Sequence, residues 1–158
     1  MHQIVGIAEM KVTNRREDVL VTHSLGSCVG VALYDPGACV GGLIHCMLPL
    51  SSIDPAKAAA NPSMFVDTGV PALLQAVFNL GAERRRLIAI VAGAGKPLDQ
   101  NGVFKIGERN YTVLRKVLWK NNILIAKEDV GGTMPRTMTL YMEDGRTTIR
   151  SRGIEATL

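Results

Sequence analysis

The side chains in this sequence best suited to covalent chemistry are its three cysteines, and Cys28 has the most suggestive setting. It follows Gly26 and Ser27 directly and precedes an apolar run, residues 29–34, that is rich in β-branched residues. This pattern places Cys28 at the edge of a strand, where the N–H groups of Gly26, Ser27 and Cys28 itself could hold an oxyanion. Taken alone, such a cysteine is more typical of core packing, because free cysteine is among the most buried residue types.

A histidine in the next apolar stretch, His45, changes the interpretation of Cys28. It lies within residues 39–47, at the end that matches the position of Cys28 if the two stretches form a hairpin. By itself, His45 is more typical of a core histidine bonded to a backbone carbonyl. Paired with Cys28, it becomes a candidate general base, because a cysteine beside a histidine can exist as a reactive thiolate–imidazolium pair.

Other polar or reactive residues have weaker claims on the chemistry. Thr22 ends an early strand and could orient the imidazole or bond a carbonyl substrate. His2 and His23 are alternative bases, although His2 lies at a terminus, where chains are commonly poorly ordered. Cys39 and Cys46 are most simply core residues. The cysteines form no C-x-x-C pair and no metal-ligand cluster is visible, so neither a metal nor another cofactor is expected.

Two further motifs fit binding sites poorly. Residues 93–96 read Gly-Ala-Gly-Lys after an apolar strand, yet they lack the Gly-x-x-x-x-Gly-Lys-Ser/Thr spacing of phosphate loops, so nucleotide binding is not favoured. The run Arg84-Arg85-Arg86 is more typical of a solvated junction than of a nucleic-acid surface, because no aromatic residues interleave with it. In a chain with a net charge of only +4, this run could still contact an acidic partner protein.

The elements that must position these residues follow from hydrophobic periodicity and turn signals. Asp144-Gly145 predicts a tight hairpin turn, whereas residues 49–62 have no clear periodicity and are expected to be a loop. Pro71 would break a helix unless it lies in the first turn, so the main helix is expected to begin near residue 70. Strands are expected at residues 3–9, 19–22 continuing into 25–28, 29–34, 39–47, 87–92, 123–126, 137–142 and 146–151, and helices at 70–80 and 107–120.

Length favours one domain spanning residues 1–158, and the expected strands and helices make it a mixed α/β domain. Hydrophobic residues make up 47% of the chain and charged residues 20%, which is ordinary globular usage. Aromatic residues make up only 4%, so the core must be aliphatic. No N-terminal signal segment is visible and no apolar run approaches the roughly 20 residues that span a bilayer, so membrane insertion is not expected. Free cysteines then favour a reducing cytoplasm.

Five short motifs, in order along the chain, resemble those of the chemoreceptor glutamine deamidases, the CheD family. The two most specific contain the candidate nucleophile and base: Leu-Gly-Ser-Cys-Val at residues 25–29 and His-x-Met-Leu-Pro at residues 45–49. The supporting motifs are Phe-Val-Asp-Thr at 65–68, Ile-Gly-Glu-Arg-Asn at 106–110 and Glu-Asp-Val-Gly-Gly at 128–132.

The resemblance implies a layered sandwich of β-sheets with outer helices, related to bacterial deamidase toxins, with Cys28, His45 and Thr22 as the catalytic group. Members of the family convert selected glutamines to glutamate on the cytoplasmic helices of methyl-accepting chemotaxis receptors, and some hydrolyse receptor methyl esters. Several bind a phosphatase partner, CheC. Residues 93–97 and the Pro135–Arg136 pair depart from the usual family pattern, which bears on partner or substrate details.

The expected reaction is acyl transfer through a thioester: His45 takes the Cys28 proton, the thiolate attacks a glutamine carboxamide, and water releases glutamate. Two alternatives remain open. The chain could be a non-catalytic regulator that binds and stimulates a CheC-type phosphatase, with Cys28 structural. Its main activity could instead be the hydrolysis of receptor methyl esters by the same residues.

Overall fold

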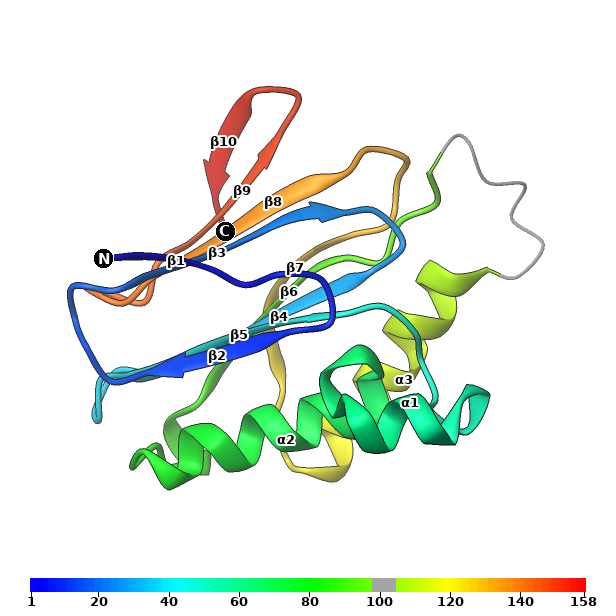
Figure 1. Cartoon of the computed structure of the whole chain (residues 1–158). Helices are drawn as coiled ribbons and strands as arrows, with labels where there is room; N and C mark the ends of the chain where they lie inside the picture. Colours follow the sequence, from blue (N-terminus) through cyan, green and yellow to red (C-terminus); the bar gives the residue numbers. More distant parts are fainter. Residues whose placement is uncertain (98–104) are drawn as a thin grey trace.

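The computed structural model describes residues 1–97 and 105–158, and it contains two five-stranded β-sheets with helices outside one of them. Figure 1 shows the order of the layers, which is one sheet, then the second sheet, then the helices. The mixed α/β class with layered sheets and outer helices, expected from the sequence, is confirmed.

The first sheet, here called sheet A, has one face on the core and one on solvent. Buried and half-buried residues alternate along its middle strand, as expected of such a sheet. The strands are β1 (His2–Ile4), β3 (Val19–Leu25), β8 (Arg136–Tyr141), β9 (Thr147–Ser151) and β10 (Ile154–Thr157). Their order is β1-β3-β8-β9-β10, with β1 parallel to β3 and all other neighbours antiparallel.

The second sheet, sheet B, lies in the middle of the molecule. Its strands are β2 (Met10–Thr13), β4 (Val29–Asp35), β5 (Val40–Cys46), β6 (Ile88–Gly93) and β7 (Ile125–Val130). The order is β2-β5-β4-β6-β7, and only β6 and β7 run parallel. β4 and β5 are buried along their whole lengths, because sheet A covers one face of sheet B and helices cover the other.

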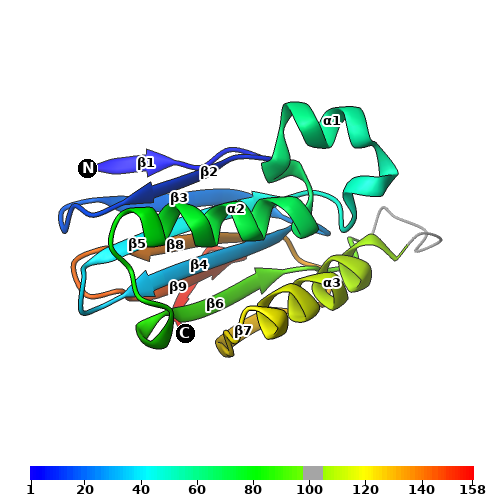
Figure 2. The same ribbon diagram turned by 90° about the horizontal axis from the view of Figure 1, so that it is seen from below.

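The helical layer packs on the face of sheet B that points away from sheet A, as Figure 2 shows for the two longer helices. It contains α1 (Pro55–Ala60), α2 (Val66–Asn79) and α3 (Ile106–Lys120), together with 3₁₀ turns at Ser51–Ile53, Pro62–Met64 and Arg84–Arg86. Two apolar clusters result. One, with Leu33, Leu73 and Leu114, lies between sheet B and the helices, and the other, with Leu43 and Met138, lies between the sheets.

Both expected hairpins and the second helix are confirmed. β4 pairs with β5 in antiparallel register, and β8 pairs with β9 across the Asp144-Gly145 turn. α3 begins one residue before the expected start and ends at the expected residue. These elements combine clear periodicity with strong turn residues, which is why local sequence specifies them well.

The expected single strand over residues 3–9 is wrong, because the chain turns in the middle of it. β1 ends at Ile4, and Ala8 adopts a φ of 61°, which is left-handed backbone. The Gly6 N–H donates to the Glu9 side chain across this turn at 2.7 Å. The chain then passes from sheet A to sheet B, where β2 begins at Met10. An apolar run alone does not reveal that its two ends belong to different sheets.

The expected loop over residues 49–62 and the expected helix start near residue 70 are also wrong. α1 forms within the loop, where the Asp54 side chain accepts a hydrogen bond from the Lys57 N–H at 3.2 Å. α2 begins at Val66 and includes Pro71. Its first N–H groups are bonded by the preceding chain, since Val66 donates to the Leu48 carbonyl at 2.9 Å, which supports an early start despite the proline.

Two differences remain at the C-terminal side of the chain. β7 covers residues 125–130 rather than 123–126, and β10 adds an edge strand that the sequence did not predict. All four residues of β10 are exposed, so they lack the alternating apolar pattern by which strands are recognised. Among the described residues, no helix is long and apolar enough to cross a membrane.

Candidate active site

The structure brings Cys28 and His45 to one face of the β4–β5 hairpin. His45 is directly opposite Gly30 in the antiparallel register, and Cys28 precedes Gly30 by two residues. The Cys28 carbonyl still accepts a ladder-like bond from the Ala94 N–H at 2.8 Å. Cys28 packs against the apolar cluster between the sheets, the side on which His45 meets sheet A. Diagonal neighbours of this kind lie roughly 7–8 Å apart at Cα, within reach of longer side chains.

Thr22 determines which nitrogen of His45 carries the proton. The Thr22 hydroxyl lies 2.7 Å from the Val5 carbonyl oxygen and 2.7 Å from Nδ1 of His45. A hydroxyl has one hydrogen, and the Val5 carbonyl can only accept it. Thr22 therefore accepts a hydrogen bond from His45, whose Nδ1 must be protonated. A neutral imidazole in this tautomer carries its free lone pair on Nε2.

That lone pair is buried. Nε2 of His45 has no hydrogen-bond partner among the described residues, and the side chain is 0% exposed. Burial lowers the pKa of His45 to about 4, because desolvation disfavours the imidazolium form. At neutral pH His45 is consequently neutral, and its Nε2 can accept a proton.

Cys28 is half-buried, and burial raises the pKa of its thiol, although the Cys28 N–H opposes this shift by bonding the thiolate. Both pKa shifts, upward for the thiol and downward for His45, favour the neutral thiol–imidazole pair over the ion pair. At rest the proton is therefore on the sulfur and the imidazole is neutral, an arrangement that can pass the proton to Nε2 if the sulfur attacks a substrate.

The turn before Cys28 presents the donors that an oxyanion would need. The Gly26 N–H already donates to the Ser24 carbonyl at 3.0 Å, and the Gly26 carbonyl accepts from the Gly95 N–H at 2.8 Å. Within residues 1–97 and 105–158, the N–H groups of Ser27 and Cys28 donate to no backbone carbonyl outside the regular elements. Of the residues expected around the oxyanion, Ser27 has an N–H with no backbone acceptor among the described residues, whereas the N–H and carbonyl of Gly26 are both bonded.

Two glycines, one at the end of β6 and one just after it, pack closely against this turn. Gly93 has a φ of 97°, and a Cβ there would overlap the Cys28 carbonyl oxygen. A Cβ added at Gly95 would lie 3.1 Å from the Gly131 carbonyl oxygen and 3.0 Å from that of Gly132. The Gly95 N–H is bonded to the Gly26 carbonyl, so this segment supports the turn before Cys28, and that N–H is not available to a phosphate.

Asn110 also lies at the site, although the sequence indicated it only as part of the motif at residues 106–110. Asn110, on α3, is fully buried, and its Nδ2 donates to the Ser27 carbonyl at 2.9 Å and to the Met47 carbonyl at 3.1 Å. It therefore bridges the residue before Cys28 and the chain just after His45. The available signal was a polar residue on the inward-facing side of an amphipathic helix.

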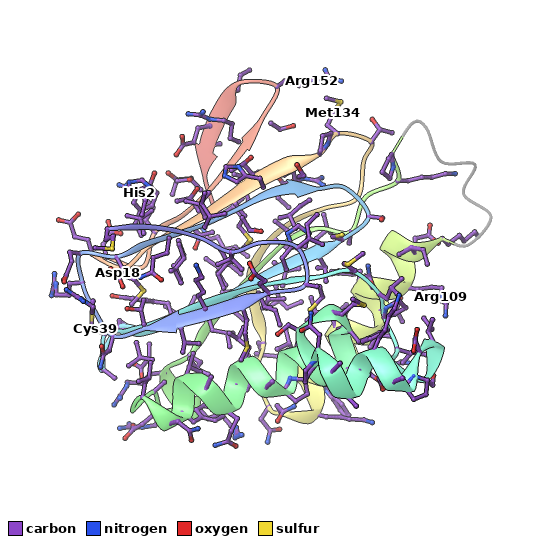
Figure 3. The ribbon with its side chains drawn as sticks, in the orientation of Figure 1. His2, Asp18, Cys39, Arg109, Met134 and Arg152 are labelled. Carbon is purple, nitrogen blue, oxygen red and sulfur yellow. The ribbon has the colours of Figure 1, made fainter. Side chains whose placement is uncertain are left out.

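The other candidate bases and thiols lie elsewhere. Figure 3 shows His2 and Cys39 at the end of the sheets opposite to that of Arg109 and the start of α3. His23 is exposed, and its ring contacts Thr137 on sheet A at 3.4 Å. Cys46 is fully buried on the helix side of sheet B, and burial strongly raises the pKa of its thiol.

The arginine run is bound within the chain. The Arg86 Nε donates to the fully buried Asp35 at 2.8 Å, and Arg85 donates to Glu83 at 3.0 Å. The Arg84 guanidinium lies 4.8 Å from the centre of the Phe78 ring. Each of the three arginines therefore has a nearby structural partner in the chain. Among the described residues, no group of three or more His, Cys, Asp or Glu side chains is arranged to hold a metal ion.

A thiol beside a hydrogen-bond-donating turn, with a neutral, oriented imidazole on the same face, can perform acyl transfer. The chain also matches known proteins along most of its length. The family model described as CheD chemotactic sensory transduction matches residues 47–151. A solved structure of a Neisseria meningitidis protein of the DUF152 family aligns over 82% of this chain and 63% of its own, with 10% identity and a TM-score of 0.45.

Three curated relatives are named probable chemoreceptor glutamine deamidases CheD. The protein from Solibacter usitatus is 51% identical over 150 residues, which is 95% of this chain and 89% of the relative. Those from Syntrophus aciditrophicus and Anaeromyxobacter dehalogenans are 47% and 39% identical, covering 95% and 93% of this chain and 94% and 92% of their own lengths. The chain belongs to the CheD family.

Proposed function

We propose that this protein deamidates glutamine side chains on the cytoplasmic helices of chemoreceptors and works in the cytoplasm. The names of its relatives support the substrate class. One observation carries the mechanism: His45 has its Nδ1 tied to Thr22 and its Nε2 buried without a described partner, on the hairpin face that it shares with Cys28. A base with this tautomer is ready to accept a proton from the thiol.

The first half of the reaction forms a thioester. Nε2 of His45 takes the proton from Sγ of Cys28 while the sulfur attacks the carboxamide carbon of the glutamine. The resulting oxyanion accepts hydrogen bonds from the N–H groups of Ser27 and Cys28. The C–N bond then breaks as His45 returns the proton to the departing nitrogen, and ammonia leaves.

The second half restores the enzyme. His45 removes a proton from a water molecule, whose oxygen attacks the thioester carbon. The C–S bond breaks, the thiolate regains the proton from His45, and the substrate leaves as a glutamic acid side chain, which loses its proton to solvent and becomes glutamate. Thr22 acts throughout by holding Nδ1, so that each proton passes through Nε2.

The decisive experiment measures deamidation of a purified receptor cytoplasmic fragment by intact mass and ammonia release. Cys28→Ala should lower turnover by at least about 1,000-fold, and His45→Ala by about 100-fold or more. Cys39→Ala is the matched control, because Cys39 lies in the turn at the other end of β4, and it should retain full turnover. Wild-type turnover in Cys28→Ala would show that another group is the nucleophile.

The ester alternative uses the same residues, because an ester carbonyl can replace the amide at the same thiol. Comparing glutamine-containing and methyl-esterified receptor fragments at equal concentration measures the preference between them. The proposal requires turnover of the glutamine fragment, and an enzyme that acts only on the ester would contradict it.

The regulatory alternative is tested with a purified CheC-type phosphatase, which we include as a proposed partner on the strength of family membership alone. Deamidation should fall when the phosphatase is added in excess. Alkylation of Cys28 does not discriminate between catalyst and regulator, because burial raises the thiol pKa in either case. A chain that binds the phosphatase but never deamidates the fragment would establish the regulatory role instead.

A further inference from the structure

Asn110 connects the two halves of the proposed active site through one amide group. Its Nδ2 has two hydrogens, and the two acceptors are the carbonyls of Ser27, at 2.9 Å, and Met47, at 3.1 Å. Ser27 directly precedes Cys28, and Met47 is two residues after His45. Both donors are therefore used, and they span the gap between the nucleophile turn and the end of β5.

The same side chain carries an energetic disadvantage. Oδ1 of Asn110 is buried and has no hydrogen-bond partner among the described residues. A buried unpartnered acceptor costs about 1–3 kcal/mol, which an apolar side chain would avoid. Residues that lower local stability in this way are found mainly at functional sites.

The backbone beneath Asn110 is anchored to the loop that flanks Cys28. A Cβ at Gly107, one turn earlier on α3, would overlap the carbonyl oxygen of Gly95 and lie 2.7 Å from that of Ala94. Ala94 donates to the Cys28 carbonyl at 2.8 Å. The first turn of α3 thus packs backbone to backbone against this loop, which gives Asn110 a rigid base.

We propose that Asn110 is a positioning residue that sets the separation between the Cys28 thiol and the His45 imidazole. The inference rests on the proposed function and deepens it. Without the bridge, the β4–β5 pairing still holds Val29 against Cys46, but beyond that pair the Ser27 and Met47 carbonyls lose their shared donor and can move apart. Since proton transfer and attack require close alignment, a displacement of about 1 Å can lower the rate about 100-fold.

The test is the kinetics of Asn110→Ala and of the nearly isosteric Asn110→Asp on the receptor fragment, at a temperature where each variant is folded by circular dichroism. Ala removes the NH₂ group with both donor hydrogens, and Asp replaces that group with one oxygen, which cannot donate when the carboxylate is ionised. The expected result is a kcat about 10- to 100-fold lower with KM within about threefold of wild type. The split arises because the thiol and base are misaligned while the substrate surface is intact.

Asn121→Ala is the matched control on the same helix. Its Nδ2 donates to the Val117 carbonyl at 2.8 Å at the far end of α3, so the variant loses a helix contact away from the site. It should keep the wild-type kcat even if its melting temperature falls as much as that of Asn110→Ala.

Two outcomes would overturn the inference. A folded Asn110 variant with kcat within about twofold of wild type would show that the bridge is dispensable. A raised KM with unchanged kcat would place Asn110 in substrate binding. The Cys28→Ala variant distinguishes a failure of the positioning role from a failure of the proposed function. If Cys28→Ala is inactive while Asn110→Ala is fully active, the positioning role fails and the proposed function stands. If Cys28→Ala is active, the proposed function itself fails.

Discussion

The Thr22 hydroxyl lies 2.7 Å from Nδ1 of His45, and it reaches this nitrogen from the opposite sheet. Thr22 lies on β3 of sheet A, and β3 has a register irregularity directly after it, between Thr22 and Leu25. His45 lies on β5 of sheet B. The bond therefore joins the two layers at the site and assigns the histidine tautomer. β-bulges are common beside active sites, where they redirect side chains.

Replacing Thr22 with valine should lower kcat about 10- to 100-fold, because Nδ1 of His45 loses the acceptor that fixes its tautomer and ring orientation. Thr22→Ser keeps the hydroxyl and should remain within about threefold of wild type. The measurement is steady-state deamidation of the receptor fragment. Equal activities for the Val and Ser variants would mean that the hydroxyl does not orient the base.

The pH dependence of kcat/KM should show an unusually acidic lower limit. Below its pKa of about 4, His45 is protonated and cannot accept a proton from Cys28. The acid limb of the profile reports this group in the free enzyme. Activity should persist well below the ordinary histidine pKa of about 6.5. An acid limb centred at that ordinary value would contradict the buried neutral base.

Stability should fall as the pH is lowered through the same window. His45 has a pKa of about 4 when folded against 6.5 in the reference state, so between these values the unfolded chain binds a proton that the folded chain does not. The free energy of unfolding then decreases by about 3 kcal/mol from above this window to below it. Urea unfolding of wild type and His45→Gln at both ends of the window measures this change in the free energy of unfolding. In His45→Gln, which has no imidazole to titrate, most of the change should be absent.

Asp35 should be a major stabilising residue without any catalytic role. Burial alone would raise its pKa, but the Arg86 guanidinium and the N–H groups of Glu83, Ala38 and Gly37 hold the pKa at about 2. Asp35→Ala leaves these donors without a partner and should lower stability by about 3 kcal/mol.

The control for Asp35 is Asp144→Ala, which removes a single exposed turn bond to the Arg146 N–H and should have a much smaller effect. Thermal melting compares the two variants. Activity per folded molecule should be unchanged in Asp35→Ala, because Asp35 lies at the end of β4 opposite to Cys28. A stability loss no larger than that of the control would refute this assignment.

Gly107→Ala should impair both stability and catalysis. Its new methyl group would overlap the Gly95 carbonyl, so α3 must shift and take Asn110 with it; overpacking of this kind costs about 1–3 kcal/mol. Gly69→Ala on α2 is the control, because it also lacks space, 2.9 Å from a methyl group of Ile44, but does not touch the Cys28 turn. Enzyme assays at matched folded fraction should show a kcat loss in Gly107→Ala alone.

Local sequence was sufficient for the hairpin that carries Cys28 and His45. Two apolar stretches separated by Asp-Pro-Gly specify antiparallel strands, and the side-chain period of two then puts both residues near the same end. The Asp144-Gly145 turn specified the second hairpin in the same way. In each case the residues in contact are close in the chain, so periodicity and turn chemistry contain the information.

Tertiary structure decided how those residues are held. The tautomer of His45 depends on Thr22 and the Val5 carbonyl, from two other segments, and the bridge across the site comes from Asn110 on a helix much later in the chain. The same is true of the turn at Gly6–Ala8, where the chain passes between sheets. These features are set by contacts between distant segments, whose registers no local pattern encodes. The sequence by itself indicated Cys28 and His45 as the candidate thiol and base, and only the folded layers determined which nitrogen of His45 carries the proton and which contacts hold its ring.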